Sequence, residues 1–506
     1  MSLVVAACSG DTEGTTTTGG GTGTPDGGTD TTQGGTDTTA DPGSGDAEGR
    51  VVVALTGDID NFDPHTNQLI LFQYSVKENV FETLVGYDED LNLVPELAES
   101  WEVSDDATEY TFTLVEGATF HDGTPVDAEA VVANLQRVGE QQSVWAGRVS
   151  LVEQYETPDD RTVKITLSQP SAPFLDGLTG LSMISVDSFD SAVENPIGSG
   201  PFEFVEWVPN DHILLERNDD YWGDPVDYAE LELRPIPDAQ VAYTNLQAGE
   251  VDVIVVASTA LVEQAETVGD GEIVRPNFSN SMTLIEMSGI EDVRVRQAIA
   301  HAMDREALNQ VAYGGQGEVA DSPLPKGNFA YCEVESYEYD LERAQELLAE
   351  AGAEGFEFQM EVLAGRPQAE QLGRIWQQGL EEIGVDLTIN VSELSVWLDY
   401  YVNRDYDVTW NSFNHPADPH PYWELVIGED RRSEATEELF QQAAQAADVD
   451  ERADLYCQLQ ELALEEMVIF PVILEPLHSI VASDRVSGYE IWPNGWGIFT
   501  NMTVSG

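Results

Sequence analysis

The sequence predicts an α/β fold in which helices cover central β-sheets. Segments with the apolar spacing of helices alternate with short apolar strand candidates, and hydrophobic residues make up 42% of the 506-residue chain. This supply of apolar side chains is enough for a large core and excludes a chain that is disordered throughout. At about 100 to 200 residues per domain, the length indicates two or three domains.

The first elements follow from local patterns near the start of the foldable region. Residues 51–55 form an apolar run that predicts a short buried strand. Over 110–114, apolar and polar residues alternate, which is typical of a strand with one buried face. Asp127 can accept hydrogen bonds from the first turn of a helix, so we expect a helix from 128 to about 137.

Three further helices are expected in the second half of the chain, over 292–303, 340–352 and 372–383. An aspartate begins the first two, and a glycine stops the last two, as caps commonly do. Strand candidates alternate with these helices at 356–363, 385–391, 407–410 and 468–474.

The charge balance is strongly acidic, with 94 Asp and Glu against 21 Lys and Arg and a formal net charge of −73. A protein that neutralises phosphates needs a basic face, so this balance excludes nucleic acid as a partner and disfavours an anionic membrane surface. An acidic surface stays hydrated at high ionic strength, where self-repulsion is screened. We therefore expect a salt-adapted, halophilic source; an acidic proteome without extreme salt is the alternative.

The N-terminus predicts a lipid anchor. Val5-Ala6-Ala7-Cys8 fits the lipobox pattern, in which small residues precede a cysteine that is lipidated after cleavage, so we expect residues 1–8 to be the remainder of a lipoprotein signal. Residues 9–49 are almost entirely Thr, Gly, Asp, Ser and Pro, the composition of a disordered tether. We expect the folded part to lie outside the cytoplasm, at the cell surface or in the periplasm, and to meet the membrane through the lipid alone.

Two cysteines remain if Cys8 is acylated. Cys332 and Cys457 would then be an even pair in an oxidising compartment, which favours a disulfide between them. Two separately buried thiols are the alternative, because the sequence does not fix the distance between them.

Four ordered blocks carry a resemblance to a known family. They are 93–137, including Phe120-His-Asp-Gly-Thr-Pro-Val-Asp; 197–202 with 217–222; 295–304; and the expected helix at 340–352. Together they resemble family 5 extracellular solute-binding proteins, the oligopeptide, dipeptide and nickel type of ABC importer receptors.

The resemblance implies a periplasmic-binding-protein type II fold, with two lobes, an additional inserted domain and a hinge between the lobes. It implies a receptor that performs no covalent chemistry, needs no cofactor, acts as a monomer and delivers a small-molecule or peptide ligand to ABC transporter permease subunits. Hinge strands are expected near 275–280 and 473–479. The implied division is lobe I at 50–78, 196–274 and 479–506, the inserted domain at 79–195, and lobe II at 275–478.

The resemblance also places ligand contacts in the segment 406–423. Many peptide receptors of this family carry an acidic residue three positions before the Asp-Pro pair, where it binds the peptide ammonium; here that position is His415. A neutral imidazole cannot replace that carboxylate. Residues 416–420 instead look like the Pro-x-Asp-Pro-His loop of nickel-chelate receptors, in which the histidine contacts the metal.

Arg366 resembles the Arg of the Arg-Pro pair that some dipeptide receptors use for the ligand carboxylate; an ordinary surface ion pair is its alternative. Asp418 is either a ligand contact or a cap of backbone amides. A metal site in the protein is not expected, and His415 and His420 would act only on a chelated cargo. The candidate ligand-binding residues are therefore Arg366, Trp410, Asn411, His415, Asp418 and His420.

Peptides are the first choice of cargo, a nickel or other metal chelate the second, and a sugar or other small solute the third. Trp397, Trp410 and Trp423 could stack on a sugar ring, although aromatics at this spacing are more often core. A sensory receptor on the same fold is a further alternative. The sequence contains no Gly-x-Ser-x-Gly, no His-Glu-x-x-His and no P-loop, so no enzyme class is indicated.

Overall fold

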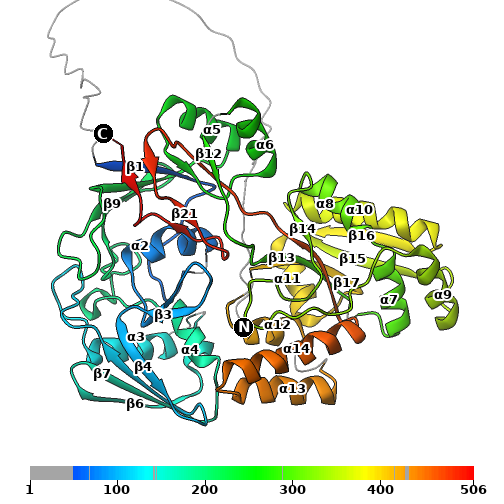
Figure 1. The fold of residues 1–506 in the computed structure, drawn as a ribbon, viewed down its shortest axis with the longest axis horizontal. Helices are drawn as coiled ribbons and strands as arrows, with labels where there is room; N and C mark the ends of the chain where they lie inside the picture. The colour runs from blue at the N-terminus through cyan, green and yellow to red at the C-terminus, as the bar shows by residue number, and fades with distance from the viewer. Residues whose placement is uncertain are drawn as a thin grey trace, which may run out of the picture.

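The computed structural model describes residues 49–67, 69–140, 143, 145–269, 271–287, 289–414, 416–427 and 432–505. The lipobox with Cys8, the expected tether up to residue 48 and the candidate ligand residue His415 lie outside the described residues. Within the described chain, three main sheets form separate centres of packing (Figure 1).

The seven-stranded sheet is assembled from distant parts of the chain. Its central strand β1 (Arg50–Leu55) is parallel to both of its neighbours. The apolar run of β1 is buried from Val51 onward, as expected for a central strand with both faces covered. The strand order is β12 (Glu272–Val274), β19 (Ser479–Val481), β11 (Val253–Ile254), β1, β10 (Glu230–Pro235), β9 (His212–Arg217) and β8 (Phe202–Val208).

Two helices, α5 (Ala239–Ala248) and α6 (Thr259–Val268), pack on one face of this sheet. The opposite face buries short helical segments that follow β1 and two small hairpins near the C-terminus. Those segments are α1 (Ile70–Phe72), the π-helix at Gln73–Lys77, α2 (Glu78–Val80), the hairpin of β20 (Val486–Ser487) and β23 (Thr503–Val504), and the hairpin of β21 (Glu490–Ile491) and β22 (Gly497–Ile498).

The six-stranded sheet mixes parallel and antiparallel pairs. Strand β13 pairs antiparallel with both β17 and β18, whereas β15 is parallel to β16 and β17. The order is β14 (Glu318–Val319), β18 (Ile469–Leu474), β13 (Ser281–Glu286), β17 (Val408–Asn414), β15 (Glu357–Leu363) and β16 (Asp386–Ser392).

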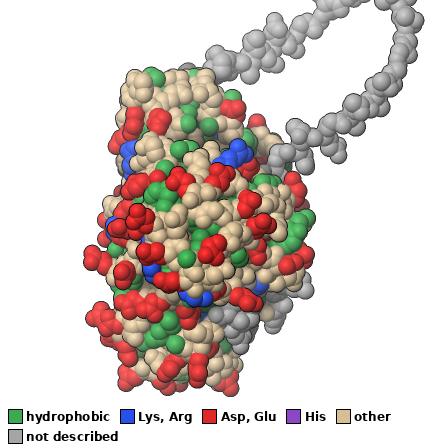
Figure 2. Space-filling view, turned by 90° about the vertical axis from the view of Figure 1, so that its right-hand side faces the viewer, with side chains coloured by type: hydrophobic (Ala, Val, Ile, Leu, Met, Phe, Trp, Pro, Cys, Tyr) green, Lys and Arg blue, Asp and Glu red, His purple; other side chains and the backbone are tan. Residues whose placement is uncertain are grey.

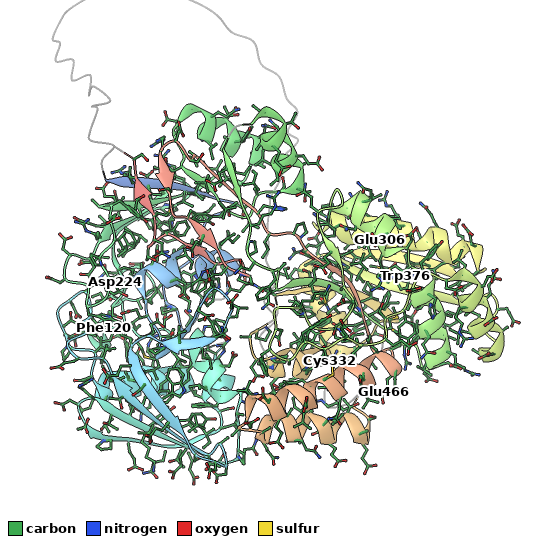
Figure 3. The ribbon with its side chains drawn as sticks, viewed as in Figure 1. Phe120, Asp224, Glu306, Cys332, Trp376 and Glu466 are labelled. Carbon is green, nitrogen blue, oxygen red and sulfur yellow. A yellow bond between two sulfur atoms is a disulfide. The ribbon has the colours of Figure 1, made fainter. Side chains whose placement is uncertain are left out.

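Helices cover both faces of the six-stranded sheet. One face packs against α7 (Val293–His301), α8 (Arg305–Ala312), α9 (Leu341–Ala351) and α10 (Pro367–Glu382), with the buried Trp376 of α10 at its centre (Figure 3). The other face packs against α11 (Leu394–Asn403), α12 (His420–Val426), α13 (Glu434–Gln445) and α14 (Val449–Glu465).

A four-stranded antiparallel sheet forms the third centre. The order is β4 (Ala98–Val103), β5 (Glu109–Leu114), β7 (Thr162–Leu167) and β6 (Val152–Asp159). Helix α3 (Ala128–Glu140) packs on this sheet through Val131, Leu135 and Val138. A hairpin of β2 (Val85–Tyr87) and β3 (Leu93–Pro95) precedes it, and the short helix α4 (Phe174–Gly177) follows it.

The chain crosses twice between the seven-stranded and six-stranded sheets. The first crossing runs from β12 to β13 through 275–280, and the second runs from β18 to β19 through 475–478. A backbone bond from the Glu475 amide to the Ser281 carbonyl, 2.8 Å, joins the two crossings where they leave the six-stranded sheet. The ends of β13, β17 and β18 at this edge therefore lie toward the seven-stranded sheet.

The helix and strand predictions agree closely with the structure. Asp127, Asp292 and Asp340 each accept a hydrogen bond from a backbone amide in the first turn of their helix. Gly352 ends α9 in the left-handed conformation, with φ +67°, which glycine adopts without the penalty of a side chain. The strand expected at 407–410 is longer than predicted and continues to Asn414.

Cys332 and Cys457 are joined by a disulfide, with their Cα atoms 5.7 Å apart (Figure 3). The bond links the segment between β14 and α9 to the middle of α14. Both residues are half-buried, so the bond lies near the surface of the six-stranded sheet's helical layer.

Among charged side chains, acidic ones far outnumber basic ones on the face of the molecule in Figure 2. Figure 2 shows Asp and Glu spread over one whole face, with Lys and Arg few among them. Many of the bases are already engaged in ion pairs, such as Arg50 with Glu230 and Glu232. Among the described residues, no helix combines the length and the apolar character that a membrane span requires.

Candidate functional site

Strand β17 leaves part of one edge without a strand partner. Its pairing with β15 covers Val408 and Thr409, whereas β17 itself continues through Asn414. Its other edge stays paired with β13 up to the match of Asn414 with Ser281. Strand β15 ends at Leu363, two residues after this pairing, so the outer edge of β17 lies beyond the end of β15 from Ser412 to Asn414, on the side of the sheet from which the chain crosses to the other lobe.

Trp410 and Arg366, two of the predicted ligand residues, come together at this edge. Trp410 is 5% exposed, and no hydrogen-bond partner for its indole nitrogen is found in the described chain. Arg366 is the N-cap residue of α10, and its guanidinium carbon lies 6.0 Å from the centroid of the Trp410 ring. Side chains alternate along a strand, so Ser412 and Asn414 share the face of Trp410.

Glu475 lies in the second chain crossing, at the same end of the six-stranded sheet, with β13 between it and β17. Its Oε1 accepts hydrogen bonds from the hydroxyls of Thr283, at 2.5 Å, and Tyr313, at 3.3 Å. Its Oε2 accepts one from Ser281, at 3.3 Å. Ser281 and Thr283 are neighbours on one face of β13, so three hydroxyl groups orient this carboxylate.

Tyr313 connects the carboxylate with Arg366 electrostatically. Burial raises the pKa of Tyr313 well above its ordinary value, and the negative charge of Glu475 raises it further. The positive charge of Arg366 acts in the opposite direction and lowers that pKa. The Tyr313 hydroxyl therefore lies within electrostatic range of both Glu475 and Arg366, and this end of the sheet carries both charges.

A C-terminal turn borders this edge. The turn 492–496 belongs to the hairpin of β21 and β22, and the carbonyl of Pro493 accepts a hydrogen bond from the Asn280 amide, at 2.9 Å. The Asn414 side-chain amide donates to the carbonyl of Asn494. Trp496 lies against Lys77, whose ammonium is 4.8 Å from the ring centroid. The turn therefore contacts a chain crossing and the end of β17.

Asp418 occupies a buried network between α14 and the inserted part of the chain. Its carboxylate pairs with Arg452, at 3.1 Å, and accepts bonds from the Tyr456 hydroxyl and its neighbouring His420 amide, each at 2.9 Å. Its own amide donates to Asp176 of α4, at 3.0 Å. Burial raises the pKa of both carboxyls, that of Asp176 to about 7, with Asp418 as the next largest cause.

Asn411 faces the side of the sheet opposite to Trp410. Its side-chain amide donates to the buried carboxylate of Glu286, at 2.6 Å. The Tyr401 and Tyr406 hydroxyls also donate to Glu286, each at 3.0 Å. Trp397 stacks on Tyr401, with ring centroids 4.9 Å apart. The structure therefore places Asn411 and Trp397 in a packed polar and aromatic layer beneath the sheet.

His420 begins α12 and packs into that helical layer. Its ring stacks on Phe440 with centroids 4.0 Å apart, and the guanidinium carbon of Arg432 lies 3.7 Å from the centroid of the Phe440 ring. Burial, followed by the charges of Arg432 and Arg452, lowers the pKa of His420 to about 3. Trp423, on the same helix, is fully buried. Neither side chain lies with Arg366 and Trp410.

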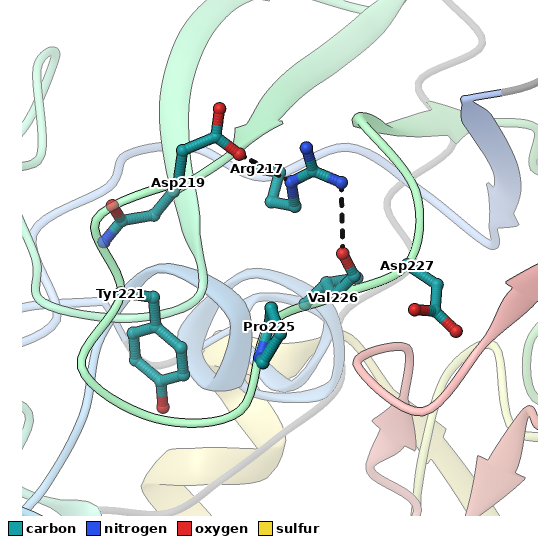
Figure 4. A pocket seen from close by; sticks show the side chains of 7 residues that line it. Arg217, Asp219, Tyr221, Pro225, Val226 and Asp227 are labelled. Atoms are coloured by element: carbon teal, nitrogen blue, oxygen red, sulfur yellow. Dashed lines mark hydrogen bonds and ion pairs between the residues drawn. The ribbon is translucent and has the colours of Figure 1, made fainter.

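The described residues contain no group of three or more His, Cys, Asp or Glu side chains arranged to hold a metal ion. A hollow of about 340 Å³ is present elsewhere, on the connection between β9 and β10 (Figure 4). Its one base, Arg217, is bound to Asp219, at 2.8 Å, and to the Val226 carbonyl, at 3.2 Å. Acidic side chains line this hollow and no predicted ligand residue lies in it, so it is a weaker candidate than the β17 edge.

Sequence reasoning missed Glu475, Tyr313, Thr283 and Ser281. The expected hinge strand at 473–479 contained Glu475, but one glutamate among 94 acidic residues carries no distinguishing signal. The hydroxyl residues come together with it through sheet pairing, which no local pattern in the sequence reveals.

The comparisons with known proteins agree with this architecture. The family model described as bacterial extracellular solute-binding proteins, family 5 Middle, matches residues 92–433. Heme-binding protein A of Haemophilus influenzae is 29% identical over 487 residues, which covers 85% of this chain and 87% of that protein. The dipeptide-binding protein of Escherichia coli is 26% identical over 468 residues, covering 81% and 86%.

A solved structure shows the same fold along the chain. HbpA2 from Haemophilus parasuis superposes with a TM-score of 0.82 and 26% identity, covering 90% of this chain and all of that one. The two principal sheets, the inserted sheet and the double crossing are thus those of a two-lobed type II periplasmic binding protein. Because the family model matches most of the length of the chain, the chain belongs to the family 5 bacterial extracellular solute-binding proteins.

Proposed function

We propose that this protein is the substrate-binding receptor of an ABC importer, and that it captures short peptides outside the cytoplasmic membrane and delivers them to permease subunits. One observation carries the peptide assignment. Strand β17 runs beyond its pairing with β15, next to Trp410 and Arg366. An extended peptide can add to such an edge through backbone hydrogen bonds, which bind many sequences alike.

The length of this part of the strand suits a short ligand. Beyond the end of β15, from Ser412 to Asn414, the strand advances two residues, or roughly 7 Å, enough for about two or three residues of an extended peptide. Arg366 at one end of the edge offers a guanidinium that can form two parallel hydrogen bonds with a terminal carboxylate. A protein with a net charge of −73 repels carboxylates at long range. A base near the ligand would offset this repulsion for the terminal carboxylate of a peptide.

The names of relatives support a peptide ligand without deciding it. The Escherichia coli relative is a dipeptide-binding protein, whereas the Haemophilus influenzae relative is a heme-binding protein. A metal chelate as cargo draws no support from His420, which is neutral, half-buried and stacked on Phe440. Peptides remain our first assignment on the geometry of β17.

We further propose that the lobes close by bending at the two crossings. Lobe I would comprise 50–78, 196–274 and 479–506, the inserted domain 79–195, and lobe II 275–478. Two short connecting segments between rigid sheets are the usual form of a hinge. The turn 492–496, which already contacts the end of β17 through Asn494 and Asn414, would border the bound ligand on the lobe I side.

The protein would be held at the cell surface or in the periplasm through lipid on Cys8, with residues 9–49 as its tether. It would act as a monomer in an organism that lives in high salt. Mass spectrometry of the N-terminal fragment released from membranes tests the lipid, because a Cys8→Ser variant would lose the acyl mass and leave the membrane fraction.

A thermal-shift screen tests the cargo class. The protein in molar salt would be heated with di- to pentapeptides, with heme, and with Ni²⁺ in the presence and absence of free histidine. A ligand at 100 times its Kd adds about 2.7 kcal/mol to the free energy of unfolding, which gives a clear upward shift. Shifts with peptides alone support the proposal. Stabilisation by heme or by the nickel chelate alone refutes it.

A further inference from the structure

We propose that the contact of α4 in the inserted domain with lobe II is a proton-dependent latch, which holds the lobes together while the buried acid Asp176 carries a proton. This inference goes beyond the assignment of a cargo. It rests on one part of the proposed function, the closure of the lobes at the two chain crossings. The receptor would therefore close more readily in acid than in alkali, whichever ligand it binds.

Two hydrogen bonds form the latch, and each joins segments that lie far apart in the sequence. Oδ1 of Asp176 accepts a bond from the amide of Asp418, at 3.0 Å. The amide of Ala172 donates to the carbonyl of Ala444, near the end of α13, at 2.8 Å. Figure 1 shows α4 next to one end of the pair formed by α13 and α14. The two partners of each bond lie on opposite sides of the chain crossings, so both bonds must break when the lobes swing apart.

The latch buries two carboxyl groups close to each other. Asp176 is 8% exposed and Asp418 is 3% exposed. Burial is the largest cause that raises the pKa of Asp176, to about 7, and the negative charge of Asp418 is the next. The positive charge of Arg148 acts in the opposite direction and is a smaller cause. Two buried carboxyl groups at this distance disfavour the doubly ionised state, so the contact is strongest when one of them is neutral.

The surroundings of the two acids place the proton on Asp176. The carboxylate of Asp418 pairs with Arg452 and accepts hydrogen bonds from the Tyr456 hydroxyl and the His420 amide, all of which favour its ionised form.

At Asp176 the same oxygen, Oδ1, accepts from the Tyr87 hydroxyl and from the Asp418 amide. Its other oxygen, Oδ2, is therefore the place for the proton. Tyr87 also packs near Trp496, with ring centroids 6.2 Å apart, so the latch is connected to the turn that borders the β17 edge.

The other titratable groups around the latch keep their charge near neutral pH. Burial raises the pKa values of the neighbouring tyrosines and lowers that of His420 to about 3. A proton that enters or leaves this cluster between pH 4 and 7 therefore belongs to the carboxyl pair. The groups that face the pair are Tyr87 of β2, Tyr110 of β5, Arg148, Arg452 and Tyr456 of α14, His420, and Lys77, which donates to the Thr179 carbonyl.

The direction of the pH effect follows from the two states of Asp176. In the closed receptor its pKa is about 7, whereas a water-exposed aspartate in the open receptor titrates near about 4. Protonation therefore favours the closed receptor. This contribution is complete below about pH 4 and is lost as the pH rises to about 7. One pKa unit corresponds to a factor of ten, so the ratio of closed to open receptor should fall at least tenfold between pH 5 and pH 8.

The experiment measures hydrogen exchange of the full chain in molar salt, without ligand, at pH 5 and pH 8. The amides of Ala172 and Asp418 both donate across the latch, so their protection, corrected for the intrinsic pH dependence of exchange, reports its opening. This protection should fall at least tenfold from pH 5 to pH 8. The Leu167 amide, bonded to the Thr108 carbonyl within the inserted domain, should keep its protection. Small-angle X-ray scattering under the same conditions should show a larger radius of gyration at pH 8.

Three variants test the role of the acid. Asp176→Asn keeps an acceptor oxygen for the Asp418 amide but cannot ionise, so its protection should change less than threefold between the two pH values. Asp187→Asn is the matched control, an exposed acid of the same domain, and should behave as wild type does. Tyr87→Phe gives a second measurement that does not depend on the folding of Asp176→Asn. The Tyr87 hydroxyl lowers the pKa of Asp176, so its loss should move the fall in protection to higher pH.

Three results would overturn the latch. They are equal protection of the two amides at both pH values in wild type, an equal fall in Asp176→Asn, and a parallel fall at Leu167, which would mean that the whole inserted domain unfolds. None of these results bears on the cargo, which the thermal-shift screen tests separately. If scattering shows no change in shape with pH or with any ligand of that screen, the proposed closure itself fails, and the latch fails with it.

Discussion

Replacing Cys332 and Cys457 together with serine should destabilise the six-stranded sheet and its helices. The disulfide closes a loop of 125 residues, and the helices and strands described within it belong to this sheet and its helical layers. In the chain-entropy treatment, a loop of this length restrains the unfolded chain by about 5 kcal/mol at 25 °C. Engineered and natural bonds often contribute less, so we expect a loss between about 2 and 5 kcal/mol.

Urea unfolding measures this loss, followed by tryptophan fluorescence and by far-ultraviolet circular dichroism in molar salt. Wild type would be unfolded with and without a phosphine reductant, and the double-serine variant under the same two conditions. The reductant should lower the wild-type midpoint to that of the variant and leave the variant unchanged, because both cysteines are half-buried and accessible. Coincident curves for oxidised wild type and the variant would refute the reasoning, since the bond would then restrain nothing in the unfolded chain.

Three further predictions concern charge and packing. Burial and the neighbouring Asp418 raise the pKa of Asp176 to about 7, so the fold favours the protonated acid, and its contribution to stability is lost as the pH rises from about 4 to about 7. Asp176→Asn should flatten the pH dependence of the melting temperature in that window and should melt higher than wild type at pH 8. The control Asp187→Asn, at an exposed position, should follow wild type. If the melting temperatures of all three proteins depend on pH in the same way, the raised pKa of Asp176 is wrong. Trp376→Ala should cost about 3 to 5 kcal/mol in urea unfolding, because the side chain is fully buried, whereas Val391→Ala at an exposed position should cost under about 0.5 kcal/mol. Dialysis from molar salt into dilute buffer should lower the melting temperature sharply, because the 94 acidic side chains repel one another without screening, and sucrose at equal osmolality should not restore it.

Much of the fold could be predicted because its signals are local. An aspartate before an apolar stripe, a glycine after it and a two-residue alternation each depend on a few neighbours in sequence. Asp340 and Gly352 bracket α9 for this reason, and β5 buries alternate residues. The four family blocks then indicated the type II periplasmic-binding-protein fold, which no local pattern contains.

The candidate site was harder to predict because it depends on which way a strand faces. Trp410 and Asn411 are neighbours, yet one lies beside Arg366 and the other donates to Glu286 on the opposite side. Both strand faces are buried by helices, so the usual contrast between apolar and polar faces gave no guidance. His420 was ambiguous in the same way, since only the packing of Phe440 against it shows where its ring lies.

The placement of β19 has a consequence for how the chain folds during export. In the seven-stranded sheet β19 lies between β11 and β12, and β12 pairs with β19 alone. Because β19 comes from residues 479–481, β12 has no neighbour until nearly the whole chain has emerged. The six-stranded sheet, whose last strand ends at Leu474, is complete before that moment. A chain that emerges N-terminus first can therefore complete its six-stranded sheet before its seven-stranded sheet, and a stop in synthesis between 475 and 478 would release a chain whose seven-stranded sheet lacks β19.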